Sequence, residues 1–173
     1  MGSGYEYQRI ASIMREPKPI EGARALLFER LTDLDPRSQE EPEPLRILNR
    51  VALRESVRRE LGRLLNTRCS IPTHLLGQQE RTVIDYGIPD FSSFSPQSSN
   101  DQKLLAAIIG QTISAFEPRL RQVEVTVEGF LSSERALLVR IDAVLVVESI
   151  SEQVSFPVII NNKTGTVQVH ESQ

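Results

Sequence analysis

The clearest hydrophobic pattern lies in residues 45–66, where apolar side chains recur every three or four positions. This segment contains no proline, and Gly62 is its one glycine. This spacing gathers the apolar side chains on one face of a helix and leaves polar side chains on the opposite face. We therefore predict an amphipathic helix here, whose buried face consists of Leu53, Val57, Leu61, Leu64 and Leu65.

A second helical pattern covers residues 101–116. Asn100 or Asp101 is expected to cap its start, because a short polar side chain can accept a hydrogen bond from the free N–H groups of a first turn. Pro118 disfavours a helical backbone at the residue before it, so the helix should end near Glu117. Its apolar stripe consists of Leu104, Leu105, Ile108, Ile109, Ile113 and Phe116.

Beyond residue 120 the apolar positions follow a period of two, which is typical of strands with one buried face. Residues 123–127 and 154–160 alternate in this way, and residues 137–147 form a long run rich in β-branched side chains. Turn-forming residues separate these runs, so three antiparallel strands are predicted. Residues 166–170 predict a fourth, frayed strand at the edge.

This order of elements, helices first and strands afterwards, predicts an α+β fold. We expect two main helices packed on one face of a three- to four-stranded antiparallel sheet, in a single domain over residues 45–173. Residues 1–44 are predicted to form a largely extended arm with a short helical segment at 23–34. Five prolines interrupt this arm: Pro17, Pro19, Pro36, Pro42 and Pro44.

Composition narrows the possible functions. The net charge of -3 gives no overall field that would attract nucleic acid. A single cysteine, Cys69, allows no intrachain disulfide, which fits a reducing cytosol. No stretch has the roughly 20 apolar residues that a membrane span needs. We expect a cytoplasmic protein with no direct membrane insertion.

Catalytic residues are scarce. Cys69 with His74 is the one cysteine–histidine pairing close in the sequence, and it lies in a proline-bounded loop. His170 stands alone near the C-terminal end, and the sequence holds no metalloprotease, nucleophile-elbow or phosphate-loop motif. We therefore expect no enzyme, no cofactor and no metal site.

Two other functions stay open at this point. Glu117, Asp90 or Asp142 could serve a lysozyme-like cell-wall glycosidase, with Glu117 as general acid. Such clefts normally present aromatic platforms, whereas this chain has no tryptophan and 5% aromatic residues. A nucleic-acid-binding module is the second alternative, although acidic strands without interleaved aromatics follow the arginine-rich helix.

The first predicted helix is rich in arginine, with seven in residues 45–68 against two glutamates. Arg58, Arg59 and Arg63 lie opposite its apolar face, and Glu55 stands four residues before Arg59, at the spacing of a helical ion pair. The pattern fits either a solvated, salt-bridged face or a surface that binds carboxylates of a partner. We keep Arg58, Arg59 and Arg63 as candidate partner-binding residues.

A compact charged element, Glu117-Pro118-Arg119, marks the passage from the second helix to the first strand. It could be a helix stop with incidental charges. Alternatively, Pro118 has a fixed φ and would aim Glu117 and Arg119 at partner groups, where the guanidinium can donate two parallel hydrogen bonds. On this second interpretation both charged side chains should be exposed.

Several blocks, in order, resemble the TssE family of wedge subunits in the bacterial type VI secretion baseplate, which is similar to the lysozyme-like wedge proteins of contractile phage tails. The blocks are LFERLTD at 27–33, ESVRRELGRLLNTR at 55–68, DYGIPDF at 85–91 and FEPRL at 116–120. With the paired strands, the resemblance spans roughly residues 26–160. The first 20 residues and the last nine match nothing in the pattern.

The resemblance implies a non-enzymatic subunit of the baseplate wedge. It implies docking on the TssF and TssG subunits through Glu117, Pro118 and Arg119, with TssK as a further candidate partner, in a baseplate docked at the membrane. It also implies a sheet edge that helps to start sheath assembly by strand addition to sheath subunits. The candidate edges are the strands that contain Leu137 and Val154.

Overall fold

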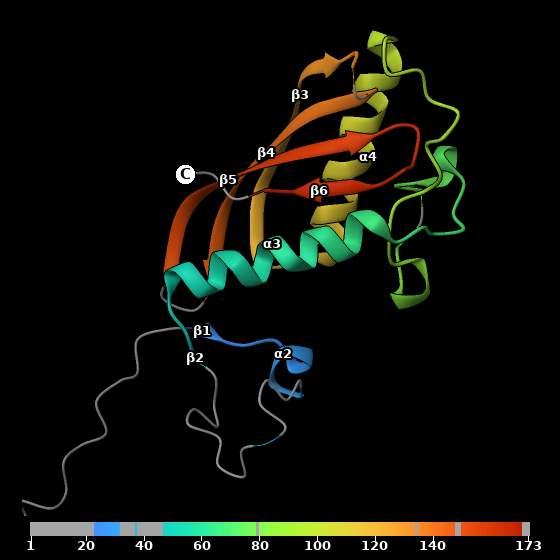
Figure 1. Ribbon diagram of the computed structural model, residues 1–173. Helices are drawn as coiled ribbons and strands as arrows, with labels where there is room; N and C mark the ends of the chain where they lie inside the picture. The colour runs from blue at the N-terminus through green and yellow to red at the C-terminus, as the bar shows by residue number, and fades with distance from the viewer. Residues whose placement is uncertain are drawn as a thin grey trace, which may run out of the picture.

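The computed structural model describes residues 23–31, 37, 47–78, 80–133, 135–147 and 150–170 (Figure 1). Within them lie two long helices and a four-stranded antiparallel sheet, which confirms the predicted α+β fold. Most of residues 1–44 lies outside the described residues. The extended arm and the domain boundary after residue 44 therefore stay predictions.

The main sheet has the order β3-β4-β5-β6, with every neighbouring pair antiparallel. Its strands are β3 (Leu120–Leu131), β4 (Ala136–Val147), β5 (Ile150–Asn161) and β6 (Val167–Val169). The fourth strand, predicted as frayed, is real but only three residues long. A positive φ of 52° at Gln122 accompanies an irregularity in β3, where the register shifts between Arg121 and Glu124.

The two helices have sharper starts than the sequence predicted. Helix α3 (Arg50–Asn66) begins after Asn49, whose side chain accepts a hydrogen bond of 2.9 Å from the Ala52 N–H. Helix α4 (Ser99–Phe116) is capped by Ser98, so the expected cap at Asn100 or Asp101 was wrong. Asp101 instead accepts from the Ser95 N–H at 2.9 Å, because it already lies in the first turn. The end of α4 before Pro118 is as predicted.

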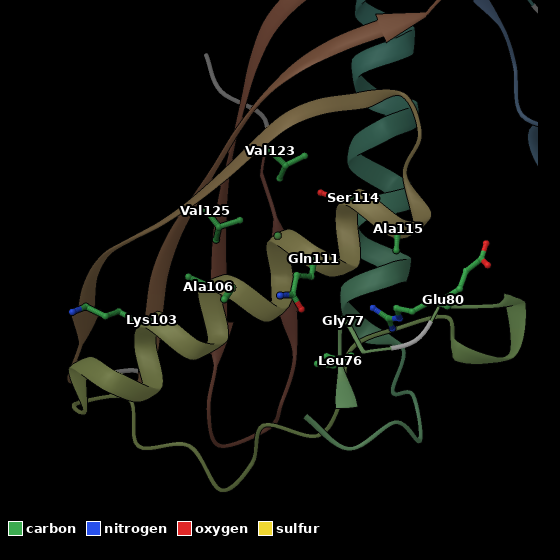
Figure 2. A pocket seen from close by; sticks show the side chains of 13 residues that line it. Leu76, Gly77, Glu80, Lys103, Ala106, Gln111, Ser114, Ala115, Val123 and Val125 are labelled. Carbon is green, nitrogen blue, oxygen red and sulfur yellow. The ribbon is translucent and has the colours of Figure 1, made fainter. Parts of the chain in front are cut away.

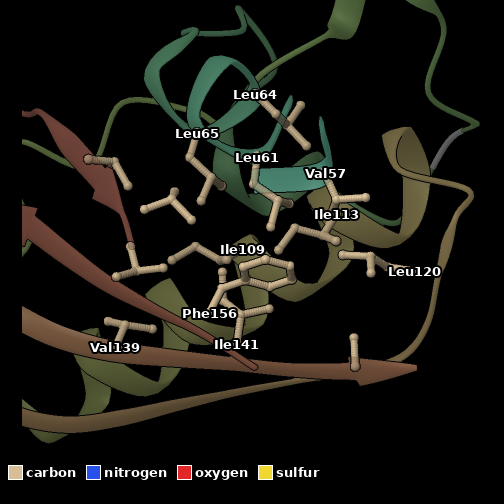
Figure 3. Packing of buried hydrophobic residues seen from close by; sticks show 14 of the residues in the cluster. Val57, Leu61, Leu64, Leu65, Ile109, Ile113, Leu120, Val139, Ile141 and Phe156 are labelled. Atoms are coloured by element: carbon tan, nitrogen blue, oxygen red, sulfur yellow. The ribbon is translucent and has the colours of Figure 1, made fainter. Parts of the chain in front are cut away.

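Both helices cover the same face of the sheet. Leu61 and Leu65 of α3 and Ile113 of α4 meet Ile141 and Phe156 of the sheet in one core (Figure 3). Each such side chain, fully buried, stabilises the fold by about 1.5–3 kcal/mol. The opposite face carries charged side chains among apolar ones, and there Arg140 forms ion pairs with Glu128 (2.6 Å) and Asp142 (2.9 Å). The predicted apolar stripes of both helices therefore indicated the core correctly.

A short segment before α3 packs against the hydrophobic core. Strand β1 (Ala23–Arg24) pairs with β2 (Ile47–Leu48), and α2 (Leu27–Leu31) follows β1 (Figure 1). Helix α2 lies within the segment predicted to be helical. Ala23 is fully buried in the core, which anchors this end of the chain.

The long connection between α3 and α4 is held in place by Arg81. Its guanidinium donates to the carbonyl oxygens of Asp85 (2.7 Å) and Gly87 (2.5 Å) and to Thr112 Oγ1 in α4 (2.9 Å). It also lies over the ring of Phe116, 4.6 Å from the centroid. Arg81 thus ties the connection at Asp85 and Gly87 to α4. No sequence pattern indicates this role of Arg81. Among the described residues, no helix is both long and apolar enough to cross a bilayer.

Candidate docking surfaces

The Glu117-Pro118-Arg119 corner connects α4 to β3, as expected, but its charged side chains are not exposed. Glu117 is 4% and Arg119 9% accessible to solvent, and Pro118 is the member that faces outward. Arg119 donates from Nε to Glu117 Oε1 (2.7 Å) and from Nη2 to Glu117 Oε2 (2.6 Å). Because the two opposite charges neutralise each other in a bidentate pair, both can be buried. The predicted exposure of Glu117 and Arg119 was therefore wrong.

A chain of hydrogen bonds extends from this corner across α3. Arg119 Nη1 donates to Ser56 Oγ (2.9 Å), and Ser56 Oγ donates to Glu29 Oε2 in α2 (3.0 Å). Glu29 Oε1 accepts from Arg59 Nη2 at 2.5 Å. We call Glu117, Arg119, Ser56, Glu29 and Arg59 the corner network. It links α2, α3 and the corner between α4 and β3, three segments that lie far apart in the sequence.

Glu29 holds the outer end of the corner network. Partial burial favours the neutral form of Glu29, but the hydrogen bonds from Arg59, Ser56 and the Leu26 N–H outweigh it and lower the pKa of this carboxyl. Glu29 is therefore held as an acceptor for both Ser56 and Arg59. By contrast, Leu27 and Leu31 of the same helix are 64% and 70% exposed. The described contacts thus fasten α2 to α3 through a carboxylate rather than through its leucines.

The arginine face of α3 is salt-bridged. Arg58 donates to both carboxylate oxygens of Glu55 (2.6 and 2.7 Å), and Arg63 pairs with Glu60. Arg59 lies 3.5 Å from Glu55, at the predicted i to i+4 spacing. The salt-bridged interpretation is therefore confirmed, while binding of partner carboxylates stays a prediction.

A groove brings these three arginines together. It has a volume of about 650 Å³ and lies between α3 and β6. Arg59 and Arg63 keep 43% and 56% of their side-chain surface exposed, and a Cβ added at Gly62 would meet no atom within 4 Å. The groove is lined by Arg58, Arg59, Gly62, Arg63, Asn66 and residues 167–170.

Side chains of α3 close the outer edge of β6. Asn66 Nδ2 donates to the Val167 carbonyl (2.7 Å), and the Val167 N–H donates to Asn66 Oδ1 (2.9 Å). Arg58 Nη1 donates to the Val169 carbonyl (2.9 Å). The Asn66 carboxamide thus pairs with the strand as a neighbouring backbone would. This edge is unavailable to another strand.

The remaining edges differ from the two predicted candidates. The strand that contains Leu137 is β4, which pairs with β3 on one side and β5 on the other, so its proposal as a free edge was wrong. The strand that contains Val154 is β5, which pairs with β6 along Val158, Ile159 and Ile160. Backbone hydrogen bonds from His170 N–H to the Pro157 carbonyl and from Asn161 N–H to the Thr166 carbonyl extend this contact, and no pairing of residues 150–156 on that side is described. Within the same residues, β3 pairs along one side alone. This long outer edge was not among the predicted candidates.

A second groove runs along β3. It has a volume of about 900 Å³ and lies between β3, the outer side of α4 and the connection near Arg81 (Figure 2). Val123 and Val125 of β3 point toward it, and Lys103 and Glu80 stand at opposite ends. The side chains that α4 contributes are mostly small: Ala106, Ala107, Gly110, Gln111, Ser114 and Ala115.

The geometry does not favour the catalytic alternatives. Both Glu117 oxygens are occupied by Arg119, so this carboxyl lacks the accessible position that a general acid needs. Cys69 Sγ accepts from Arg81 Nη2 at 3.7 Å, and no contact joins it to His74 among the described interactions. The described residues also contain no group of three or more histidine, cysteine, aspartate or glutamate side chains placed to hold a metal.

Comparison with known proteins identifies the family. The family described as Baseplate wedge protein gp25 matches residues 51–149, which is more than half of the chain. The chain belongs to this baseplate wedge family. Among solved structures, a chain of "The baseplate complex from the type VI secretion system" is similar, with 16% identity and a TM-score of 0.46 over 69% of this chain and 95% of that one. Curated proteins give no significant match.

The wedge-family match covers α4, β3, β4 and all of α3 except Arg50. It therefore contains all six predicted docking residues: Arg58, Arg59, Arg63, Glu117, Pro118 and Arg119. Glu29, which contacts Arg59, and β6, which contacts Arg58, lie outside the match. The resemblance drawn from the sequence is thus confirmed at the level of the family.

Sequence reasoning missed three residues that organise this wedge-family surface. Ser56 interrupts the apolar stripe of α3 and is fully buried, and a polar residue at a core position could have signalled a buried partner. Asn66 and Glu29 carry no such signal. Asn66 looks like an ordinary last residue of a helix, and Glu29 looks like an exposed charge in a short segment.

Proposed function

We propose that this protein is a structural subunit of a baseplate wedge, of the TssE type found in bacterial type VI secretion. The family match over residues 51–149 carries this proposal. The absence of a usable catalytic arrangement among the described residues agrees with a structural role. The expected location is the cytoplasm, in a baseplate docked at the membrane.

Docking on TssF and TssG, and on TssK as a further candidate, would use the surface above the corner network. Since Glu117 and Arg119 are buried, their role is to hold the shape of the corner rather than to reach into a partner. The groups that remain available for contact are Pro118 and the exposed parts of Arg59 and Arg63. These arginines fit an acidic surface on the partner, where a guanidinium can exchange one carboxylate for another.

Sheath assembly would use a free sheet edge. Because Asn66 and Arg58 close β6, and β4 is internal, the long edge of β3 is the best described candidate for strand addition. A sheath subunit that supplies one extended segment could pair with it through main-chain hydrogen bonds. The open part of β5 is the second candidate edge.

Co-purification tests the docking proposal. Arg59→Ala with Arg63→Ala should lower recovery of a TssF–TssG complex at least about tenfold, which corresponds to 1.4 kcal/mol. Arg140→Ala is the matched control, because Arg140 is also an exposed, ion-paired arginine but lies on the opposite face of the sheet. Equal recovery with both variants would refute docking through this face.

A further inference from the structure

We propose that the 900 Å³ groove beside β3 binds side chains of a strand added to β3. The partner that fits is an extended segment in which small aliphatic and basic residues alternate. This inference rests on the proposal that β3 accepts a strand. It adds the chemistry of the segment, which neither the family match nor a free edge specifies.

The first step concerns what lies beneath an added strand. Val123 and Val125 project from β3 toward α4, on the face that the helices cover (Figure 2). In a paired strand, alternate side chains point to the same face as their neighbours, so every second residue of the new strand would enter the groove next to these valines. The groove therefore continues the covered face of the sheet by one strand position.

The second step concerns size. Opposite the valines, α4 presents Ala106, Gly110 and Ser114, which are four residues apart, and no side chain longer than serine rises from these positions. A Cβ added at Gly110 would lie 3.6 Å from Val125 Cγ2, an ordinary contact distance, so α4 and β3 lie close together at this point. The space between helix and strand edge thus accepts short aliphatic side chains such as valine or alanine better than aromatic ones.

The third step concerns charge on the open face. There β3 exposes Glu124 and Glu128, and Glu128 shares Arg140 with Asp142. The one arginine of β3, Arg121, is also exposed but lies before the first register shift, outside the regular part of the edge. Basic side chains on an added strand would lie beside these glutamates, and opposite charges across a strand pair are stabilising. Two copies of this chain paired through β3 would instead bring glutamates together, which is unfavourable. The charge pattern thus favours a basic partner segment over a second copy.

The register of β3 limits the length of the contact. The pairing with β4 shifts between Arg121 and Glu124 and again between Val127 and Gly129. Such bulges bend a strand and end regular pairing, so the regular part of the edge lies between them. The valines that face the groove fall within or beside this part. A short segment with two or three aliphatic residues therefore suffices.

The test uses the full chain and a nine-residue peptide in which valine alternates with lysine. Binding is followed by fluorescence anisotropy, with a scrambled peptide of the same composition as ligand control. Ala107→Leu and Ser114→Leu, both at exposed positions of the groove, should each weaken binding at least about tenfold. Asn100→Leu, an exposed position of α4 outside the groove, should leave it unchanged. Glu124→Lys should also weaken binding and reduce its dependence on salt.

A peptide N-methylated at alternate residues separates this inference from the strand-addition proposal. Loss of binding on N-methylation, together with full sensitivity to Ala107→Leu, supports both. Loss on N-methylation without sensitivity to Ala107→Leu or Ser114→Leu overturns the groove inference and leaves strand addition standing. Equal binding of methylated and unmethylated peptides overturns both. Three other results would each overturn the groove inference. They are no peptide binding up to about 1 mM, a helical circular-dichroism signal from the bound peptide, and self-association of the protein that Glu124→Lys abolishes.

Discussion

Replacing Glu117 with alanine should leave the Arg119 guanidinium inside the protein without its carboxylate partner. The pair is 4% and 9% exposed and joined by two hydrogen bonds of 2.7 and 2.6 Å. Removing one partner of such a buried pair typically costs about 3–5 kcal/mol, because the remaining charge is uncompensated. Since domains are stable by about 5–15 kcal/mol, Glu117→Ala should lose a large part of the free energy of unfolding.

Urea and thermal unfolding, followed by circular dichroism, measure this loss. For a chain of this size the melting temperature should fall by roughly 6–20 °C, from about 2–4 °C per kcal/mol. The double variant Glu117→Leu with Arg119→Met should recover much of the stability, because no buried charge remains. The exposed Arg140→Ala should change little. A Glu117→Ala protein within about 1 kcal/mol of the parent would refute the buried-pair reasoning.

This result also decides how docking experiments are interpreted. If Glu117 and Arg119 were both exposed, replacing both with alanine would leave the fold intact. Because they are buried, a failure of that variant to bind partners would report damage to the corner rather than loss of a contact. Docking is better tested through Arg59 and Arg63, which are partly exposed. Because Arg59 also holds Glu29, the melting temperature of the double variant of Arg59 and Arg63 must be measured alongside its binding.

Three further changes probe other parts of the structure. Asn66→Ala should lower the free energy of unfolding by about 1–3 kcal/mol, because both backbone groups of Val167 lose their hydrogen-bond partner. The Val167 amide should then exchange its hydrogen with solvent faster, and an unchanged exchange rate would contradict the closed edge. Gly87→Ala should destabilise the fold clearly more than Gly77→Ala. Both positions have positive φ, but a Cβ added at Gly87 would lie 2.4 Å from the Thr67 carbonyl oxygen, whereas one at Gly77 would meet no atom closer than 3.9 Å; equal unfolding midpoints would contradict this. Hydrogen bonds lower the pKa of Glu29 in the folded protein below its ordinary value. The stabilisation that Glu29 gives is therefore present above the ordinary pKa and disappears as the pH falls through the folded-state pKa. Glu29→Gln should flatten this acid-side loss in a pH series of unfolding measurements, and an unchanged slope would count against it.

Much of the fold followed from local patterns. The spacing of apolar residues in α3 and α4 and the alternation in β3 and β5 predicted element type and the buried faces, because a side chain's direction depends on the local backbone period. Element boundaries were less accurate. Asn49 and Ser98 were passed over as caps, since several neighbouring polar residues could serve and the choice depends on backbone geometry.

The candidate site was predicted in its parts but not in its arrangement. The sequence pointed to Arg58, Arg59, Arg63, Glu117 and Arg119 as a set of notable charges. It could not show that Arg119 reaches Ser56, because these residues are 63 positions apart. Whether a charge is buried depends on which partner the fold brings beside it, and local sequence carries no record of that partner.

The sequence by itself determined the order of helices and strands, the faces that form the core, the proline-terminated corner and membership of the wedge family. The tertiary structure alone decided that the corner charges are internal and which sheet edge remains open. Asn66 closes β6 across 101 positions of sequence, while β3 keeps its outer side free among the described residues. The physical reason is that period and propensity act over a few residues, whereas burial and strand pairing depend on contacts between distant segments.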